Sequence, residues 1–221
     1  MGAVAVYILN DEFKRILRET KNGMVKTFSY VLTKSVLEVP IMFLFSLFGL
    51  GIPGYFIQEI NPESFWTCTM LFACCLFVWE GIAECLSVWF DNAIIGMLLF
   101  MCFWFSAFLF GGIVLPEGEL YWPFKALFYI LPYSYYFKSF VYSIFVDVEF
   151  ASCTNITSSA VCVNSTSGAA VLDALGVIMP IFSSENTVVR DAVIILLIGV
   201  FFKVAYIVGV LVKTSRMSTS K

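Results

Sequence analysis

The sequence predicts an all-α membrane protein built as a bundle of hydrophobic helices. Of its 221 residues, 60% are apolar, 13% are charged and none is histidine, which leaves too few polar side chains to cover a water-soluble surface. Backbone polar groups that cross a bilayer must be paired within the protein, so only helices and closed barrels span it. The long apolar runs lack the alternating pattern of barrel strands and therefore favour helices. The net charge of −3 gives no indication of a nucleic-acid partner.

Four apolar runs are each long enough to cross about 30 Å of hydrocarbon at about 1.5 Å per residue. They cover residues 28–56, 65–90, 93–115 and 188–212. The third run ends just before Pro116, where a proline fits the end of a span. Residues 1–9 are apolar but too few to span, and we expect them to be the end of a further span.

The segment 121–146 is dense in tyrosine and is broken by Pro123 and Pro132. Tyrosine and tryptophan prefer the membrane interface, and irregular backbone at membrane depth persists only where protein covers it. We therefore expect one or two re-entrant or interfacial helices here rather than a complete span.

Lysine and arginine gather in two segments, which sets the predicted orientation. They lie before and at the start of the first complete span and after the last span, at Lys14, Arg15, Arg18, Lys21, Lys26, Lys34, Lys213, Arg216 and Lys221. Because short cytoplasmic segments carry an excess of basic residues, we expect residues 10–24 and the C-terminus to be cytosolic. Counting spans from there places residues 147–187 outside the cell.

The predicted extracellular segment 147–187 contains two N-glycosylation sequons and two cysteines. The sequons begin at Asn155 and Asn164, and the cysteines are Cys153 and Cys162. Sequons also arise by chance in loops rich in Ser, Thr and Asn, but their coincidence with paired cysteines and with the predicted topology favours their use. A disulfide between the two cysteines would close a short loop in an oxidising compartment.

The cytosolic segment 10–24 has the pattern of a short amphipathic helix. Phe13, Ile16 and Leu17 follow the i, i+3, i+4 spacing, and charged residues occupy the remaining face. Gly23 stands where a C-cap is expected. Such a helix either lies at the lipid interface or docks in a groove of a partner, and composition does not separate the two.

The order of these features resembles the membrane domain of G-subfamily ABC transporters, including the pleiotropic drug resistance group. That family's pattern is an E-x5-RE segment followed by a glycine, a tyrosine and an acidic residue two positions before a proline. The residues that match it are Glu12, Arg18-Glu19, Gly23, Tyr30 and Glu38-Val39-Pro40. Further matches are Phe110-Gly111-Gly112, Trp122 and Leu131-Pro132-Tyr133. The resemblance covers residues 1–221 as an ABC-2 type transmembrane domain with the type II exporter fold, re-entrant helices and a small extracellular loop.

The resemblance implies how the chain is driven. Residues 10–24 look like the coupling helix that rests on a nucleotide-binding domain, with Glu12, Arg18 and Glu19 at the contact. No phosphate-binding loop, signature motif or Walker B acid occurs in residues 1–221. We expect no cofactor or catalytic site here. ATP and Mg²⁺ would act through a nucleotide-binding domain in the same polypeptide or in a separate subunit, and we favour the former, with this chain as part of it.

The family further implies a second transmembrane half, as a homodimer or heterodimer, in the plasma membrane of a eukaryote. The cargo would be lipids, sterols or amphipathic compounds, exported by alternating access. The family's central cavity is lined by phenylalanines and aliphatic residues, which makes Phe103 and Phe110 candidates for its wall. The alternative is that this Phe-rich run faces lipid.

Ionisable residues inside the predicted spans are costly, about 2.5–3.5 kcal/mol each, and should face protein or water. They are Glu38, Glu80, Glu84 and Lys203. Glu38 matches the family's acid beside proline. Glu80 and Glu84 lie one helical turn apart, and three roles are open for them: to line a cavity, to relay protons, or to make buried hydrogen bonds to neighbouring helices.

Two other classes of protein compete with the exporter. A channel or secondary transporter would use the intramembrane carboxylates as ion or proton sites, but we find no inverted repeat. A scaffold or receptor with a glycosylated ectodomain is disfavoured because the loop is small. The sequence shows neither a metal-ligand cluster nor the residues of an intramembrane enzyme.

Overall fold

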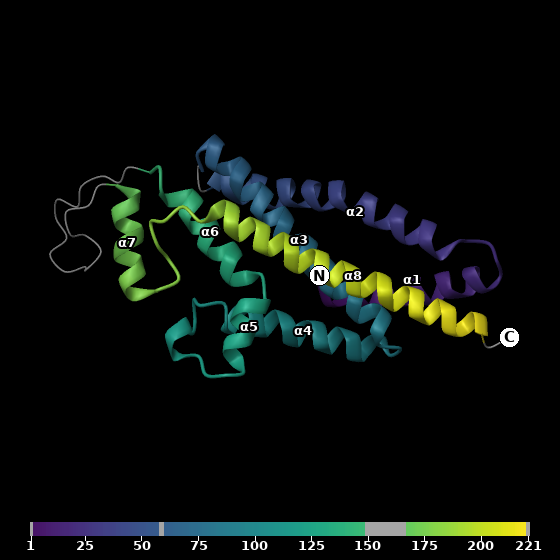
Figure 1. Ribbon diagram of the computed structural model, residues 1–221. Helices are drawn as coiled ribbons and strands as arrows, with labels where there is room; N and C mark the ends of the chain where they lie inside the picture. Colours follow the sequence, from purple (N-terminus) through teal and green to yellow (C-terminus); the bar gives the residue numbers. More distant parts are fainter. Residues whose placement is uncertain (1, 58–59, 149–166, 220–221) are drawn as a thin grey trace. The chain divides into compact units, whose positions relative to one another are not determined.

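The computed structural model describes residues 2–57, 60–148 and 167–219, and these are mostly helical (Figure 1). The α-helices are α1 (Gly2–Lys21), α2 (Thr27–Leu50), α3 (Pro62–Trp89), α4 (Ala93–Leu109), α5 (Phe124–Ile130), α6 (Tyr133–Phe145), α7 (Gly168–Ile178) and α8 (Val188–Thr219). A π-helix (Gly51–Ile57) continues α2, and a 3₁₀ turn (Glu117–Glu119) precedes α5. The all-α fold class is confirmed.

Contacts divide the chain into two compact units. Unit 1 consists of Met1–Phe45, Ala73–Phe105 and Leu196–Lys221, and unit 2 of Ser46–Phe72 and Ser106–Ile195. Helices α2, α3, α4 and α8 each contribute residues to both units.

Three stretches of helix in the described residues are long and apolar enough to cross a membrane. They are Thr27–Tyr55, Pro62–Trp89 and Val188–Ser215, and each overlaps a predicted span. The chain is therefore a multi-pass membrane protein.

Within the predicted third span, 93–115, the helix ends before the span does. Helix α4 stops at Leu109 after 17 residues, which is about 26 Å of helix and slightly less than the hydrocarbon core. Gly112 has a φ of +86°, which only glycine adopts readily. A Cβ at Gly111 would lie 2.6 Å from the carbonyl oxygen of Ala107 and 2.7 Å from the ring of Tyr133. The two glycines thus end the helix earlier than hydropathy suggests.

Helix α1 of unit 1 runs without a break through the predicted boundary between residues 1–9 and 10–24. Asn10 is compatible with the helix because the amide nitrogen of its side chain finds two acceptors there. The Asn10 Nδ2 atom donates to the carbonyl oxygens of Ser87, at 2.7 Å, and Phe90, at 2.9 Å. These carbonyls lie at the C-terminal end of α3, where helices leave acceptors unpaired.

The C-terminus of α1 has the predicted glycine cap. Gly23 has a φ of +75°, its N–H donates to the carbonyl oxygen of Thr20, and the N–H of Met24 donates to that of Glu19. This is the hydrogen-bond pattern of a Schellman motif. The chain then turns into α2.

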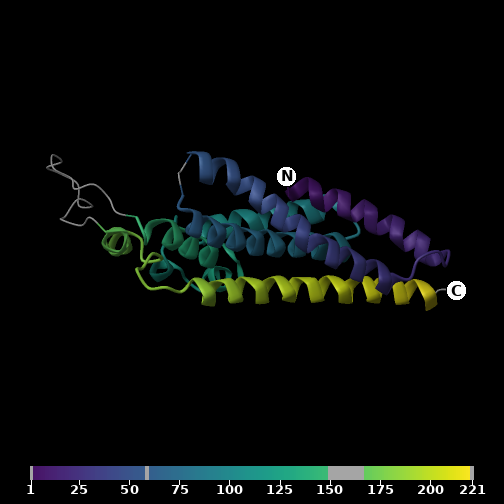
Figure 2. The ribbon, with the colours of Figure 1, turned by 90° about the horizontal axis from the view of Figure 1, so that it is seen from above.

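The core of unit 1 joins four helices. Phe13 of α1 is buried with Val31 of α2, Val88 of α3, and Tyr206 and Val210 of α8. The predicted apolar face of α1 is thus covered by the chain's own helices, rather than by lipid or by a partner. Within this unit both views place the α1–α2 connection and the C-terminal half of α8 at the same end (Figures 1 and 2).

Glycines let α3 and α8 approach closely in unit 1. A Cβ at Gly199 of α8 would lie 2.7 Å from the Phe77 ring of α3. A Cβ at Gly81 of α3 would lie 3.3 Å from Cβ of Phe202. Small residues at such contacts are typical of helices packed in membranes.

Unit 2 contains the short helices. The segment 121–146 folds into α5 and α6, of 7 and 13 residues, interrupted at Leu131-Pro132. Neither is long enough to span alone, and their re-entrant placement stays a prediction. The predicted loop 147–187 also contains a helix, α7, which we did not predict from the sequence. Cys153, Cys162, Asn155 and Asn164 lie outside the described residues.

Candidate functional site

Six charged residues of unit 1 come together from four helices, and we call them the charge cluster. They are Glu12 of α1, Lys34 and Glu38 of α2, Glu80 and Glu84 of α3, and Lys203 of α8. The sequence drew attention to all six as separate residues, but not to their meeting. The paired residues are distant from one another in the chain, so no local sequence pattern indicates the cluster.

Lys203 holds the centre of the charge cluster. Its Nζ donates to Oε2 of Glu84 at 2.5 Å and also to Oε2 of Glu38. Glu84 is fully buried, and Glu38 and Lys203 are 7% and 6% exposed. An ion pair at this depth is stable only while both signs are present, because a lone buried charge is strongly unfavourable.

Lys34 extends the cluster towards α1. Its Nζ lies 3.3 Å from Oε1 of Glu84 and 3.5 Å from Oε2 of Glu12. The hydroxyl of Tyr30 donates to Oε1 of Glu12 at 2.5 Å. A continuous series of ion pairs therefore runs from α1 through α2 and α3 to α8.

The cluster has more acid than base. It has four carboxylates and two ammonium groups, and Lys34 and Lys203 pair with three of the carboxylates, those of Glu12, Glu38 and Glu84. Within the described part of the chain Glu80 has neither a hydrogen bond nor an ion pair, and the Oε1 atom of Glu38 has no hydrogen-bond partner. One oxygen from each of Glu38, Glu80 and Glu84 lies within 4.8 Å of the others, a spacing that could hold a cation, but the Lys203 ammonium already contacts two of these three groups.

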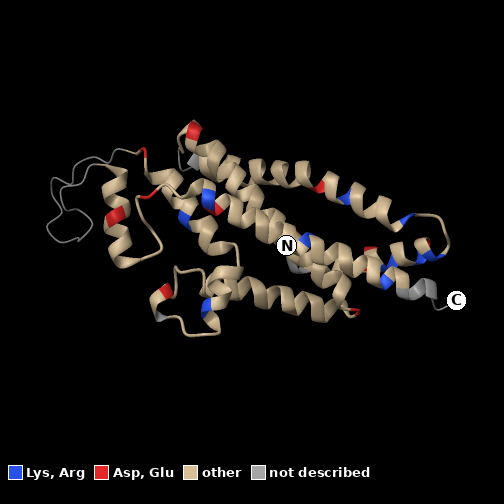
Figure 3. Cartoon of the chain, in the orientation of Figure 1, with Lys and Arg blue, Asp and Glu red and all other residues tan. Residues whose placement is uncertain are grey.

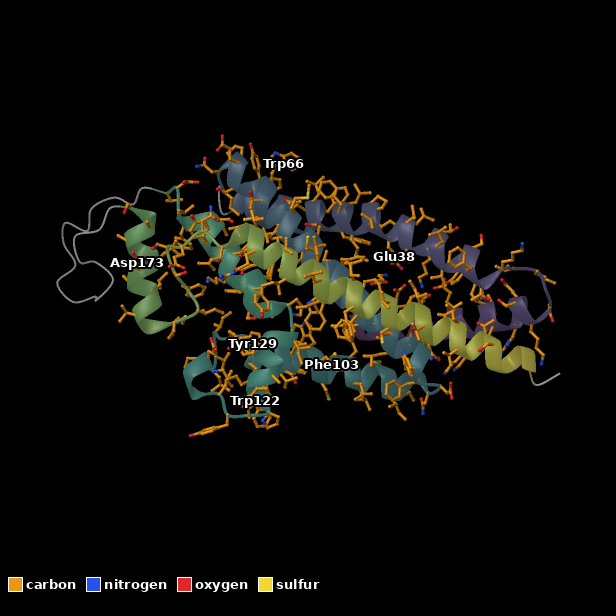
Figure 4. The ribbon with its side chains drawn as sticks, viewed as in Figure 1. Glu38, Trp66, Phe103, Trp122, Tyr129 and Asp173 are labelled. Carbon is orange, nitrogen blue, oxygen red and sulfur yellow. The ribbon has the colours of Figure 1, made fainter. Side chains whose placement is uncertain are left out.

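A groove of about 480 Å³ opens beside the charge cluster in unit 1. Its polar wall contains Glu12, Tyr30, Lys34, Glu38 and Glu80, and its apolar wall contains Leu37, Ile41, Met42 and Phe45. Figure 4 labels Glu38 on α2. The groove combines acidic and apolar surface in one space.

The residues predicted to contact a nucleotide-binding domain separate into two groups. Arg18 is exposed and Glu19 is partly exposed on α1. Glu12 instead is partly exposed and is engaged by Tyr30 and Lys34 of α2. Lys14 and Arg15 are exposed as well, so the outer face of α1 is mainly basic (Figure 3).

The two candidate cavity residues belong to different units. Phe103 is partly buried in unit 1, and Phe110 belongs to unit 2. The ring of Phe110 stacks on that of Phe124, with centroids 5.1 Å apart. Phe110 is thus already packed against its own unit.

Unit 2 holds a buried acid that sequence reasoning missed. Asp191 is fully buried in the first turn of α8, and its Oδ2 accepts hydrogen bonds from Ser139 Oγ at 2.9 Å and Thr187 Oγ1 at 2.8 Å. The signal that could have revealed it is an acid in the first turn of an apolar helix, four residues after Thr187.

Long apolar helices, with charged residues buried between them, define a helical membrane domain. The chain matches the family described as ABC-2 type transporter over residues 1–145, and it belongs to that family. It is also 25% identical over 141 residues to ABC transporter G family member 5 of Arabidopsis thaliana. That match covers 62% of this chain and 21% of the relative, so the chain spans about a fifth of the relative's length.

These similarities confirm the resemblance inferred from the residues. The chain is the membrane part of an ABC transporter of the ABC-2 type, and its similarity to a member of the G family agrees with the resemblance inferred from the residues. Membrane domains of this kind work with nucleotide-binding domains and dimerise.

Proposed function

We propose that this membrane domain exports lipids, sterols or amphipathic compounds by alternating access, driven by a nucleotide-binding domain that binds ATP and Mg²⁺. The domain would be part of the same polypeptide or a separate subunit, and a second transmembrane half would complete the pathway. The observation that carries the proposal is the way α1 is fixed within unit 1.

The inner face of α1 contacts α2, α3 and α8, the three helices of unit 1 that are long enough to cross a membrane. Asn10 binds the end of α3, Glu12 binds Tyr30 and Lys34 of α2, and Phe13 packs with Tyr206 of α8. Packed side chains and buried ion pairs transmit displacement because they do not deform continuously. A force on the exposed face of α1 therefore acts on α2, α3 and α8 together.

The outer face of α1 supplies the surface on which such a force would act. Arg18 and its basic neighbours are exposed there and can form charge-assisted hydrogen bonds to an acidic groove of a nucleotide-binding domain. Glu12 lies on the inner face of α1 and is the residue through which α1 binds α2. This revises the role expected for Glu12 and keeps the one expected for Arg18 and Glu19.

The topology of the proposed exporter follows the distribution of basic residues. The α1–α2 connection and the end of α8 lie at one end of unit 1, which supports a cytosolic location for residues 10–24 and the C-terminus. Residues 147–187 would then be extracellular in the plasma membrane, with Asn155 and Asn164 glycosylated and Cys153 joined to Cys162.

The coupling role is tested by Arg18→Glu in the full-length transporter. Reversing this charge should reduce substrate-stimulated ATPase activity and transport by about tenfold, which corresponds to about 1.4 kcal/mol of lost interaction. The basal ATPase rate and the amount of folded protein should not change. Lys26→Glu is the matched control, because Lys26 is exposed just beyond α1. Normal stimulation in Arg18→Glu would exclude the coupling role.

The charge cluster is the observation that favours the second candidate function, a channel or secondary transporter. Family membership favours the ATP-driven exporter. Substitution of the phosphate-binding lysine of the nucleotide-binding domain separates the two: transport should stop in the exporter, whereas undiminished transport would support the alternative.

A further inference from the structure

The lining of the groove in unit 1 combines apolar and acidic side chains. We call Leu37, Ile41 and Phe45, which are exposed on α2, the apolar wall. We call Glu12, Glu38 and Glu80 the acidic wall; Lys34 is the basic residue among the lining side chains, and α2 carries Lys34 and Glu38 as well as the apolar residues. A ligand that fills this space must present an apolar body and a group that suits carboxylates.

The acidic wall carries more carboxylates than ammonium groups. Lys34 and Lys203 pair with Glu12, Glu38 and Glu84, and in the described residues Glu80 pairs with neither lysine. A second feature points the same way: Glu38 is more than nine-tenths buried and lines the groove, and its Oε1 has no hydrogen-bond partner among the described residues. Buried polar atoms normally have partners, so this wall can accept a further hydrogen-bond donor, and its excess of carboxylates favours a donor that carries positive charge.

A metal ion satisfies only part of this requirement. Glu38, Glu80 and Glu84 are close enough to share a cation, but the Lys203 ammonium already contacts Glu38 and Glu84. A small hard cation would also leave the apolar wall without a contact. A protonated amine donates hydrogen bonds to carboxylates, and an attached hydrocarbon can cover Leu37, Ile41 and Phe45.

We propose that this groove binds a cationic amphiphile, with its ammonium group between Glu80 and Glu38 and its apolar body along Leu37, Ile41 and Phe45. The ring of Tyr30, over which Lys34 Nζ already lies at 6.0 Å, adds an aromatic surface that suits a cation. The inference names a ligand class for the proposed exporter and rests on that function. The ammonium can belong to a membrane lipid or to a free amine, which have the same recognition chemistry.

The test measures binding of radiolabelled dodecylamine to the full-length protein in phosphatidylcholine nanodiscs at neutral pH, with empty nanodiscs as background. Dodecanol is the matched neutral probe. Glu80→Gln should weaken dodecylamine binding by about tenfold and leave dodecanol unchanged. Ile41→Trp should weaken both probes, because it fills the apolar wall at a position that is 41% exposed and tolerates a larger side chain.

Glu63→Gln is the control variant, since Glu63 is an exposed acid on the same helix and outside the groove. It should bind dodecylamine as the unaltered protein does. Equal binding in the unaltered protein, Glu80→Gln and Ile41→Trp would overturn the proposal. Displacement of dodecylamine by Mn²⁺, with Mn²⁺ binding lost in Glu80→Gln, would also overturn it in favour of a metal site.

Nanodiscs that contain phosphatidylethanolamine distinguish the two sources of the amine. Competition with dodecylamine that depends on Glu80 would identify a lipid headgroup, and absence of competition would identify a free amine; both results support the groove. Failure of the proposed function is separable from failure of the site. If dodecylamine binding is saturable and depends on Glu80 but ATP-driven transport is absent, the exporter is refuted and the groove is not. If ATP-driven transport of other compounds is present but this binding is absent, the groove is refuted and the exporter is not.

Discussion

The two units of this chain bury polar groups in different ways. Unit 1 buries ionised side chains in pairs, with Lys203 between Glu38 and Glu84. Unit 2 buries an acid, Asp191, whose Oδ2 accepts hydrogen bonds from the hydroxyls of Ser139 and Thr187 and whose Oδ1 lies 3.4 Å from Nε of the exposed Arg190. The comparison shows that unit 1 depends on the balance of opposite charges that are all buried, whereas the acid of unit 2 is held by hydroxyl donors and by one arginine that remains in contact with solvent.

The largest expected effect comes from removing the central cation of unit 1. Lys203→Met should lower the free energy of unfolding by about 3–5 kcal/mol, because it leaves Glu38 and Glu84 buried without their shared partner. Thermal unfolding of the full-length protein in detergent measures the loss. Lys203→Arg keeps the charge and should lose less. A Lys203→Met protein as stable as the unaltered one would show that the cluster is not held by this lysine.

A smaller loss is expected from the buried acid of unit 2. Asp191→Leu should cost about 1–3 kcal/mol, since the hydroxyls of Ser139 and Thr187 lose their acceptor. Asp191→Asn is the matched variant, because the amide oxygen can accept both hydrogen bonds. The same unfolding measurement applies. If Asp191→Leu were more damaging than Lys203→Met, the contrast between the units would be reversed.

Close packing of α3 and α8 in unit 1 predicts a still smaller effect. Gly199→Ala places a Cβ 2.7 Å from the Phe77 ring, and it should cost about 1 kcal/mol because the ring can shift. At Gly51 of the π-helix a Cβ has no atom within 4 Å, so Gly51→Ala serves as the control. Equal stability of the two variants would show that α3 and α8 tolerate a wider separation.

The smallest effect is expected at the surface of unit 1. Lys213 donates a hydrogen bond to Asp91, which holds the pKa of that carboxyl below its ordinary value of 3.8. The contribution of Asp91 to stability is therefore present above that pH and is lost as the pH falls through the lowered pKa. Because Asp91 is exposed, salt should screen the pair. Asp91→Asn should accordingly unfold like the unaltered protein in high salt, and a difference that persists there would contradict this assignment.

Hydropathy predicts the long helices well because each apolar run carries its own signal. The end of α4 was missed because Gly112 adopts a positive φ that the apolar pattern does not report. The continuity of α1 was missed because Asn10 finds its partners 77 and 80 residues away. The charge cluster was missed for the same reason: the cost of Lys203 was visible in the sequence, whereas its pairing with Glu38 and Glu84 exists only in the folded helices.

The bond from Asn10 to the end of α3 also sets an order of assembly. Residue 10 is synthesised long before Ser87 and Phe90, and the ribosome adds about 5–20 residues per second. Helix α1 is therefore synthesised seconds before α3 has been inserted, and only after this insertion can the last carbonyl groups of α3 accept the hydrogen bonds of Asn10. A stall in translation within α3 would leave α1 without this contact, at the stage when the nascent chain is most open to quality control.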